Sequence, residues 1–447
     1  MVTGSGRTPH LIIAAGLCVY LLHLRQSNMT GFVTLPADCP RCNWVIDGYG
    51  HEAYIRRIAR RSRIPSPGDC WECHQPPLYY LFAGTAYRIA SAFPSIDPMA
   101  AVRVLSVGIA VCFLIFAERL LRMEITRRSA YVVALCLLTF WPLQAVLASR
   151  IGNDPAFYLA DAGMLYYILR WQRDQQPRSL GMAVLWCAIG FAVKYTAVIS
   201  VGFAATVIGV EWYRRPLRAR QIFARPVLIA LSVAAMLVVP TIVRTYSYFR
   251  VENKTSVPLL VPTVPGLVQS MGVSNDRIEY FLTPHVSDYA ASPFLGQGAM
   301  HPELRYFVNY VMKTSLFGFV VWRPVRLAFV LTALQWSLFA YVLLSAVLFA
   351  VRDRSFFARG WPLMLFAASH VLALVAYRLV YPHVGNQDFR FVYSAVIAMA
   401  ALHGMAMSSY RTAGRRYLFA CGMALTGAFV AASTAFILVS DLAGVAD

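Results

Sequence analysis

An acid and an imidazole, Asp47 and His51, stand close together near the start of the chain, in the first long polar loop. A carboxylate in this place can take a proton from an acceptor hydroxyl, and the arginines that follow it can hold a phosphate leaving group. We therefore interpret Asp47 and His51 as candidate catalytic residues, and Arg56 and Arg57 as candidate phosphate contacts.

The same arginines also fit a simpler role. Beyond Glu52 the chain opposes apolar to basic residues, with Ile55, Ile58 and Ala59 on one side and Arg56, Arg57, Arg60 and Arg61 on the other. This is the pattern of a short amphipathic helix that lies flat on a membrane and binds anionic headgroups. The residues alone leave both interpretations open.

A further pair of polar residues stands where an apolar helix is predicted to begin. His74 and Gln75 precede Pro76 and Pro77. Paired prolines fix a helix entry because neither needs to donate a backbone N–H there, so this pattern also has a purely structural explanation.

Three ionisable residues further along, Lys194, Asp388 and Arg390, lie close to apolar segments. Charged groups near a membrane are costly, so a function is the first suspicion, and Lys194 and Arg390 are candidate phosphate contacts. Each could instead extend its charge into the interface from a helix end, and Asp388 could simply pair with Arg390.

The segments that must position these residues are long and apolar. The chain has 447 residues, of which 58% are hydrophobic and 14% are charged. Apolar runs of roughly 17–25 residues, the length that crosses a bilayer, recur along it. The net charge of +19 comes from arginines in short connections between these runs, where they set orientation and meet anionic headgroups. We therefore predict a polytopic membrane protein and exclude a nucleic-acid partner.

We expect an all-α bundle of about 11 transmembrane helices (roughly 10–13), forming one domain over residues 1–447. Two long loops interrupt it, at 25–76 and 244–305. The run from Leu11 to Leu24 reads as a retained helix, because no small-residue cleavage site follows it. The segment 179–210 is long enough for two short passes that turn near Lys194.

Orientation follows from the arginine-rich connections at 118–129, 172–178, 211–225, 351–359 and 411–416, which we place in the cytoplasm. Counting passes then puts residues 153–154, the Lys194 turn, the loop 244–305 and Asp388 on the opposite face, while 306–322 re-enters or lies along the interface. The first loop is itself rich in arginine. It joins that outer face only if one of the segments 77–93 and 100–117 fails to span, and charge does not decide which.

Four of the nine cysteines fall in the first loop, as Cys39, Cys42, Cys70 and Cys73. The second pair runs into His74, which gives the Cys-x-x-Cys-His pattern of c-type haem attachment. Two such pairs also suit a tetrahedral zinc site. No axial partner for a haem stands nearby, and an oxidising compartment favours disulfides, so we favour disulfides over zinc or haem.

Taken in order, several short motifs resemble the GT-C glycosyltransferases, and most closely the bacterial glycosyltransferase 39 type, which includes protein mannosyltransferases and aminoarabinose transferases. The motifs are Asp47 with His51, His74-Gln-Pro-Pro-Leu-Tyr-Tyr80, Arg150-Ile-Gly-Asn-Asp154-Pro, Gly190-Phe-Ala-Val-Lys194-Tyr-Thr, Lys313-Thr-Ser-Leu-Phe-Gly318 and Asp388-Phe-Arg390-Phe. Each motif is weak alone, and their order and spacing carry the resemblance over most of the chain.

The resemblance implies a role for several residues. Asp47 matches the catalytic aspartate of the first extracytoplasmic loop. His74 and Gln75 stand where relatives place an acid and a lysine that contacts the lipid phosphate, and Asn153 and Asp154 match a second polar site that binds metal in some members. Lys313 joins the substrate-binding candidates. Gly48 replaces the second acid of the family's pair, which puts the sugar, the acceptor and any metal at Asp47 and Asp154 in doubt.

We therefore expect an inverting glycosyltransferase of the bacterial inner membrane that moves a sugar from a polyprenyl-phosphate donor to an acceptor in the envelope, a lipid, glycan or protein. Such a donor carries its own leaving group, so no nucleotide-binding fold is needed. The alternatives are a transporter or flippase of lipid-linked saccharides, for which we find no repeats, and a haem-bearing redox protein. The residues do not identify the sugar, acceptor, cofactor or oligomeric state.

Overall fold

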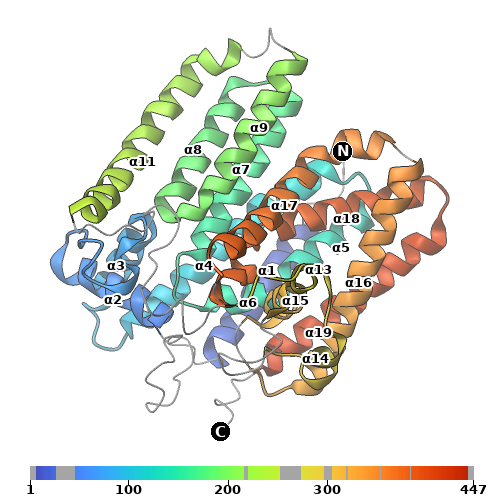
Figure 1. Cartoon of the computed structure of the whole chain (residues 1–447), viewed down its shortest axis with the longest axis horizontal. Coiled ribbons are helices and arrows are strands. Elements are labelled where there is room, and N and C mark those ends of the chain that lie inside the picture. The colour runs from blue at the N-terminus through green and yellow to red at the C-terminus, as the bar shows by residue number, and fades with distance from the viewer. Residues whose placement is uncertain are drawn as a thin grey trace. The chain divides into compact units, whose positions relative to one another are not determined.

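The computed structural model describes residues 7–26, 46–215, 220–251, 273–295, 305–318, 321–352, 354–382 and 384–440, and it forms helices throughout this part of the chain (Figure 1). The chain divides into two compact units. One comprises Met1–Ser27, Ala117–Val146 and Pro265–Ala446, and the other essentially Asn28–Phe116 and Leu147–Val264. The all-α membrane fold is confirmed, and the single domain over 1–447 stays a prediction.

The unit that holds the first loop is built from helices of both halves of the sequence. Its elements are α2 (Ile46–Arg61), η2 (Trp71–His74), α3 (Leu78–Ala90), the first part of α4 (Pro98–Glu124), α7 (Asp154–Asp174), α8 (Pro177–Val193), η3 (Tyr195–Ala197), α9 (Val198–Arg214), η4 (Arg220–Phe223) and α11 (Arg225–Val251).

The other unit holds both ends of the described chain. Its elements are α1 (Arg7–Gln26), the end of α4, α5 (Arg128–Thr139), most of α6 (Pro142–Ser149), α13 (Glu279–Leu282), α14 (Val286–Ala291), α15 (Phe307–Phe317), α16 (Val325–Arg352), α17 (Arg354–Val380), η6 (Val384–Gln387), η7 (Phe389–Val392), α18 (Ala395–Thr412) and α19 (Arg416–Val439).

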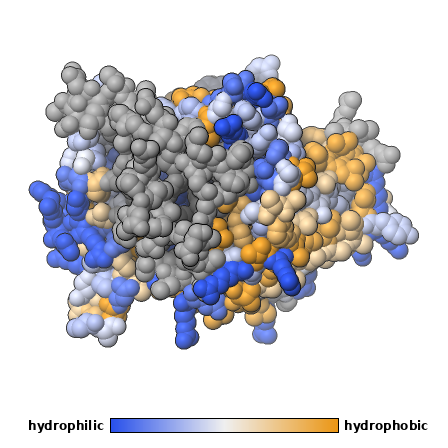
Figure 2. Space-filling view, turned by 60° about the horizontal axis from the view of Figure 1, so that its bottom comes forward, coloured by the Kyte–Doolittle hydropathy of each residue, from blue (hydrophilic) through white to orange (hydrophobic). Residues whose placement is uncertain are grey.

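Seven of the described helices are long and apolar enough to cross a membrane, and the number rises to 9 if each of two bent pairs is one span. The bent pairs are α5 with α6, at 46°, and the η6–η7 segment with α18, at 51°. Counting α7 and α8 as well would give the predicted 11. The outer faces of these helices are apolar, as on α11, where Met236, Val239 and Val243 are exposed. Figure 2 shows such hydrophobic surface gathered on one face.

The helix α3 has only 13 residues and is therefore about 20 Å long, which is short of the ~30 Å hydrocarbon layer. The following helix, α4, has 27 residues and meets the criteria for a span. Of the two segments that the sequence could not separate, 100–117 thus belongs to a helix long enough to cross, and 77–93 forms a helix that is not. The helix α15, with 11 residues, is also too short to cross, as expected for 306–322.

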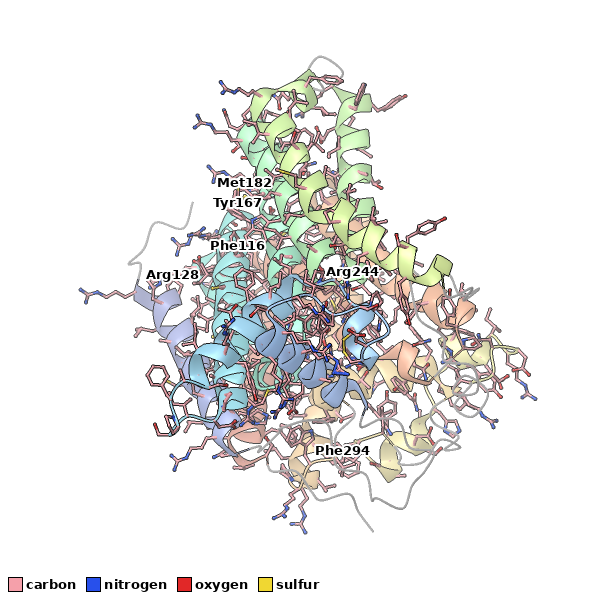
Figure 3. All side chains as sticks on the ribbon, turned by 90° about the vertical axis from the view of Figure 1, so that its left-hand side faces the viewer. Phe116, Arg128, Tyr167, Met182, Arg244 and Phe294 are labelled. Atoms are coloured by element: carbon pink, nitrogen blue, oxygen red, sulfur yellow. A yellow bond between two sulfur atoms is a disulfide. The ribbon has the colours of Figure 1, made fainter. Side chains whose placement is uncertain are left out.

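Small residues allow close packing in the first-loop unit. A Cβ atom on Gly181 of α8 would lie 2.9 Å from the backbone oxygen of Pro226 in α11, and one on Gly163 of α7 would lie 2.5 Å from the ring of Trp186 in α8. Phe116 of α4 closes this packing, with its ring 5.0 Å from that of Trp186 and 6.2 Å from that of Tyr167 (Figure 3). Close approach of backbones through glycine is a common means of joining membrane helices.

The predicted amphipathic helix of the first loop is confirmed as α2, but its apolar face does not meet lipid. Ile55 and Ile58 are buried, and Ile58 packs on α3, where a Cβ atom on Gly84 would lie 2.7 Å from its Cγ2. The apolar stripe of α2 is therefore explained by packing within the protein, not by insertion into headgroups.

Candidate active site

The imidazole of His51 is buried and held by α3. Its Nδ1 lies 2.6 Å from the hydroxyl oxygen of Tyr80, and the Tyr80 ring stacks on that of Tyr54 at 3.9 Å between centroids. Three aromatic side chains from α2 and α3 therefore form one stack, which fixes the end of α2 that carries Asp47. The side chain of Asp47 itself lies outside the described residues.

The other edge of His51 faces the loop that leads into α7. A Cβ atom on Gly152 would lie 3.6 Å from His51 Nε2, and the backbone N–H of Gly152 donates to the hydroxyl of Tyr79 at 3.4 Å. The first-loop helix thus meets the Arg150-Ile-Gly-Asn-Asp154 motif.

Asn153 and Asp154 both connect α7 to the break after α8. The chain is extended at Lys194 (φ −154°, ψ 134°), which leaves the preceding carbonyl of Val193 without a helical partner. Asn153 Nδ2 donates to that carbonyl at 3.0 Å, and Lys194 Nζ forms a buried ion pair with Asp154 Oδ1. The predicted turn at Lys194 is present, and two candidate substrate contacts are partners of each other.

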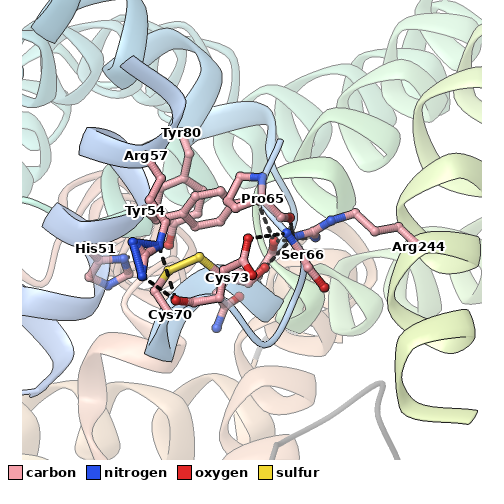
Figure 4. Close-up of a disulfide and its surroundings, with 11 residues drawn as sticks. His51, Tyr54, Arg57, Pro65, Ser66, Cys70, Cys73, Tyr80 and Arg244 are labelled. Carbon is pink, nitrogen blue, oxygen red and sulfur yellow. Dashed lines mark hydrogen bonds between the residues drawn. A yellow bond between two sulfur atoms is a disulfide. The ribbon is translucent and has the colours of Figure 1, made fainter. Parts of the chain in front are cut away.

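Arg244, near the end of α11, was not among the candidate site residues predicted from the sequence. Its side chain binds the first loop (Figure 4). Its guanidinium donates to the backbone carbonyls of Pro65 at 2.8 Å, Gln75 at 3.3 Å and Cys73. Cys70 and Cys73 are joined by a disulfide in this turn. A disulfide uses both thiols that haem attachment or a zinc site would need, while Cys39 and Cys42 lie outside the described residues.

His74 and Gln75 lie inside this turn rather than in open solvent. The Nε2 atoms of the two side chains are 3.2 Å apart, and the carbonyl of Gln75 also accepts from the hydroxyl of Tyr54 at 3.4 Å. Burial raises the pKa of Tyr54 to about 12, against the opposing effect of the nearby Arg244 charge. Tyr54 therefore stays a neutral hydrogen-bond donor near neutral pH.

The arginines of α2 contact protein groups. Arg56 Nε donates to Glu52 Oε1 at 2.7 Å and Arg56 Nη1 donates to the Tyr87 hydroxyl at 2.8 Å. Arg57 donates to the carbonyl of Asp69, at 2.5 Å from its nearer nitrogen. Their role as phosphate contacts stays a prediction.

Lys313, Asp388 and Arg390 belong to the other unit. Lys313 Nζ donates to the carbonyl of Phe294 at 3.0 Å, and Arg390 Nε lies 2.9 Å from Asp388 Oδ2. The backbone N–H of Phe389 donates to the hydroxyl of Thr314 at 3.1 Å, which brings the Lys313 and Asp388 motifs together. From the sequence, Arg390 was a candidate phosphate contact, and the simpler alternative was that Asp388 pairs with it. The structure contains this pair.

Within the described ranges, no three His, Cys, Asp or Glu side chains stand close enough together to hold a metal ion. Asp154 is paired with Lys194, and the side chain of Asp47 is not among those described. A metal at Asp47 and Asp154 therefore stays a prediction.

Residues 74–242 match the family described as dolichyl-phosphate-mannose-protein mannosyltransferase. This segment holds α3, α4, the Asn153–Asp154 motif and the Lys194 break, and it begins after Asp47 and His51. The match covers less than half of the 447-residue chain.

Several solved structures resemble this chain at low identity. ArnT from Cupriavidus metallidurans, determined with undecaprenyl phosphate bound, has 14% identity and a TM-score of 0.43, with 96% of this chain and 76% of that chain covered. AglB from Archaeoglobus fulgidus has 14% identity and a TM-score of 0.49, with 98% and 57% covered. EmbB from Mycobacterium smegmatis has 14% identity and a TM-score of 0.43, with 97% of this chain and 41% of that chain covered. No curated protein matches the sequence.

Proposed function

We propose that this protein is a membrane glycosyltransferase that moves a sugar from a polyprenyl-phosphate donor to an acceptor hydroxyl of the cell envelope, on the outer face of a bacterial inner membrane. The observation that carries the proposal is the contact of His51 with Tyr80 and Gly152. It anchors the helix that bears Asp47 against the loop that bears Asp154, so the acids of two predicted motifs belong to one region of one unit.

The length of α3 supports the outer placement. Because α3 is too short to cross, the first loop and the start of α4 belong to the same side of the membrane. The far end of α4 leads into Arg119, Arg122, Arg127 and Arg128, and clusters of this kind stay in the cytoplasm. The first loop then faces outward despite its own arginines, of which Arg56 and Arg57 are bonded to protein groups.

In the proposed reaction the carboxylate of Asp47 takes the proton of the acceptor hydroxyl. The acceptor oxygen attacks the anomeric carbon as the bond from that carbon to the phosphate oxygen breaks, and the polyprenyl phosphate leaves with the electron pair. Attack from behind the leaving group inverts the anomeric centre. The cationic groups of the loop stabilise the charge that develops on the phosphate. Asp154, neutralised by Lys194, positions the loop at Gly152.

The test is Asp47→Asn in the full chain, assayed with a radiolabelled polyprenyl-phosphate sugar and an envelope extract as acceptor. We expect turnover to fall by at least about 100-fold, because the amide cannot take the proton, while donor binding is retained. Asp174→Asn, at an exposed pair with Arg170, is the control and should leave turnover unchanged. Equal turnover in D47N and wild type, or sugar moved across the membrane without transfer, would refute the proposal.

A further inference from the structure

One buried arginine of the first-loop unit has two guanidinium nitrogens without a hydrogen-bond partner. Arg103 is only 8% exposed, and neither its Nε nor its Nη1 has a hydrogen-bond partner among the described residues. Leaving a buried charge without partners is costly, and a cation in a membrane helix is retained only where something compensates it.

Two other arginines show how this chain satisfies such a group internally. Arg244 donates to three backbone carbonyls of the first loop. In the other unit the fully buried Arg378 donates to the carbonyls of Ser274 and Arg305, at 3.2 and 2.6 Å. These two act as clamps between segments. Arg103 forms no such hydrogen bonds through its Nε and Nη1, so these donors are available to a molecule from outside the chain.

The position of Arg103 connects it with the candidate active site. It lies on the buried face of α4, one turn before Ser106, whose side chain is close enough to the Tyr79 hydroxyl to influence it. Tyr79 in turn accepts from Gly152, and Gly152 lies against His51. The same face of α4 therefore borders the region where α2, α3 and the loop before α7 meet.

The charge around Arg103 favours an anion. Side chains on a helix lean toward its N-terminus, which directs Arg103 toward Asp97 at the start of α4. The carboxylate of Asp97 influences both Arg103 and Arg56, and its Oδ1 is occupied as an acceptor from the backbone N–H of Met99 at 3.0 Å. Arg56 is already paired with Glu52, and the backbone contact of Asp97 leaves Nε and Nη1 of Arg103 open to an anion.

We propose that Arg103 binds the phosphate of the lipid-linked substrate. The inference rests on the proposed function, which supplies a phosphate at this region, and it adds a contact that none of the sequence motifs contains. A guanidinium is suited to the task, because it stays charged and offers several donors to phosphate oxygens. The ligand chemistry is an oxyanion, and both a lipid phosphate and free phosphate present it.

The test combines binding with thermal unfolding of the full chain in detergent micelles. Arg103→Met is expected to weaken binding of undecaprenyl phosphate by about tenfold to a hundredfold, the effect of losing a charge-assisted hydrogen bond. It should also leave the ligand-free Tm unchanged or raise it, because an uncompensated buried charge is removed. Arg103→Lys keeps the charge and should lose less affinity.

Arg122→Met is the matched control, because Arg122 lies on the same helix and is exposed, paired with Glu118. It should leave binding unchanged. An R103M protein that binds undecaprenyl phosphate as tightly as wild type, or one whose ligand-free Tm falls while its affinity is retained, would show that Arg103 is structural and overturn the inference.

Two further measurements distinguish a lipid phosphate from free phosphate, and failure of this inference from failure of the proposed function. If the site binds a lipid phosphate, inorganic phosphate titrated alone should raise the Tm of the wild-type protein only weakly. If inorganic phosphate raises the Tm as strongly as undecaprenyl phosphate does, the site binds a free anion and the lipid assignment is wrong. A wild-type protein that binds no undecaprenyl phosphate overturns the proposed function together with the inference. Normal wild-type binding with unaltered R103M binding overturns the inference alone.

Discussion

At the scale of single residues, the site is organised by polar groups that satisfy one another across long separations. Lys194 and Asp154, 40 positions apart, form one buried ion pair, and the Val193 carbonyl exposed by the helix break is taken by Asn153. Each is a small interaction whose loss would leave a buried group without its partner.

Removing one member of the Lys194–Asp154 pair should therefore cost more than removing both. We expect Lys194→Met or Asp154→Asn to lower the free energy of unfolding by about 3 kcal/mol or more, because each strands a buried polar or charged group. The double variant should recover part of the loss. Thermal unfolding of the purified single and double variants measures the coupling, and strictly additive losses would contradict it.

A second residue-scale prediction concerns the hydroxyl of Tyr80. Tyr80→Phe keeps the stack on Tyr54 but removes the partner of His51 Nδ1. We expect a loss of about 1 kcal/mol of stability and a larger fall in kcat than in donor affinity, since the helix that carries Asp47 loses its orientation. Tyr213→Phe, at an exposed position, is the control, and an unchanged kcat in Y80F would refute this role.

The residues that sequence reasoning found and missed differ in a physical way. His51, His74 and Asp154 stand out because polar groups are rare beside apolar segments. Tyr54 and Tyr80 look like ordinary core residues, and the partners of Arg244 are backbone carbonyls about 170 positions away, which no local pattern reveals. Similarly, a charge at the Lys194 break was visible from the sequence, but its acid partner was not.

At the scale of helices, lengths and breaks were largely predictable and lateral packing was not. Apolar length distinguishes α4 from α3 only once the true helix ends are known, because Ser91 to Asp97 continue the apolar composition in part. The apolar stripe of α2 was correctly assigned to a helix, yet the surface that covers it is α3 and not lipid.

The close approach of α8 to α11 gives a test at this scale. Gly181→Ala should lower the Tm in detergent, since its methyl group would meet the Pro226 backbone oxygen at 2.9 Å and force the helices apart. Gly202→Ala is the matched control, because nothing lies within 4 Å of a Cβ there. It should be neutral or stabilise α9 by up to about 1 kcal/mol. Equal effects of the two substitutions would contradict this packing.

At the scale of the whole molecule, the proposed orientation depends on α3 not crossing. A variant that retains only Cys70 and Cys73 tests it in spheroplasts. After mild reduction, we expect a membrane-impermeant maleimide to label the partly exposed Cys70 without permeabilisation of the membrane, while the fully buried Cys73 reacts little. Labelling that requires permeabilised cells would place the first loop, and Asp47 with it, in the cytoplasm.

The hydrogen bond from Arg244 to the Cys73 carbonyl has a consequence for how the protein matures. Newly made chains leave the reducing cytosol with free thiols, so the turn that presents these carbonyls is closed only after export, if the loop faces outward as proposed. The helix α11 would then complete its packing on the first loop only after oxidation, and a chain not yet exported would be inactive. Pulse-labelled chains should accordingly gain protease resistance around Arg244 in step with formation of the bond between Cys70 and Cys73.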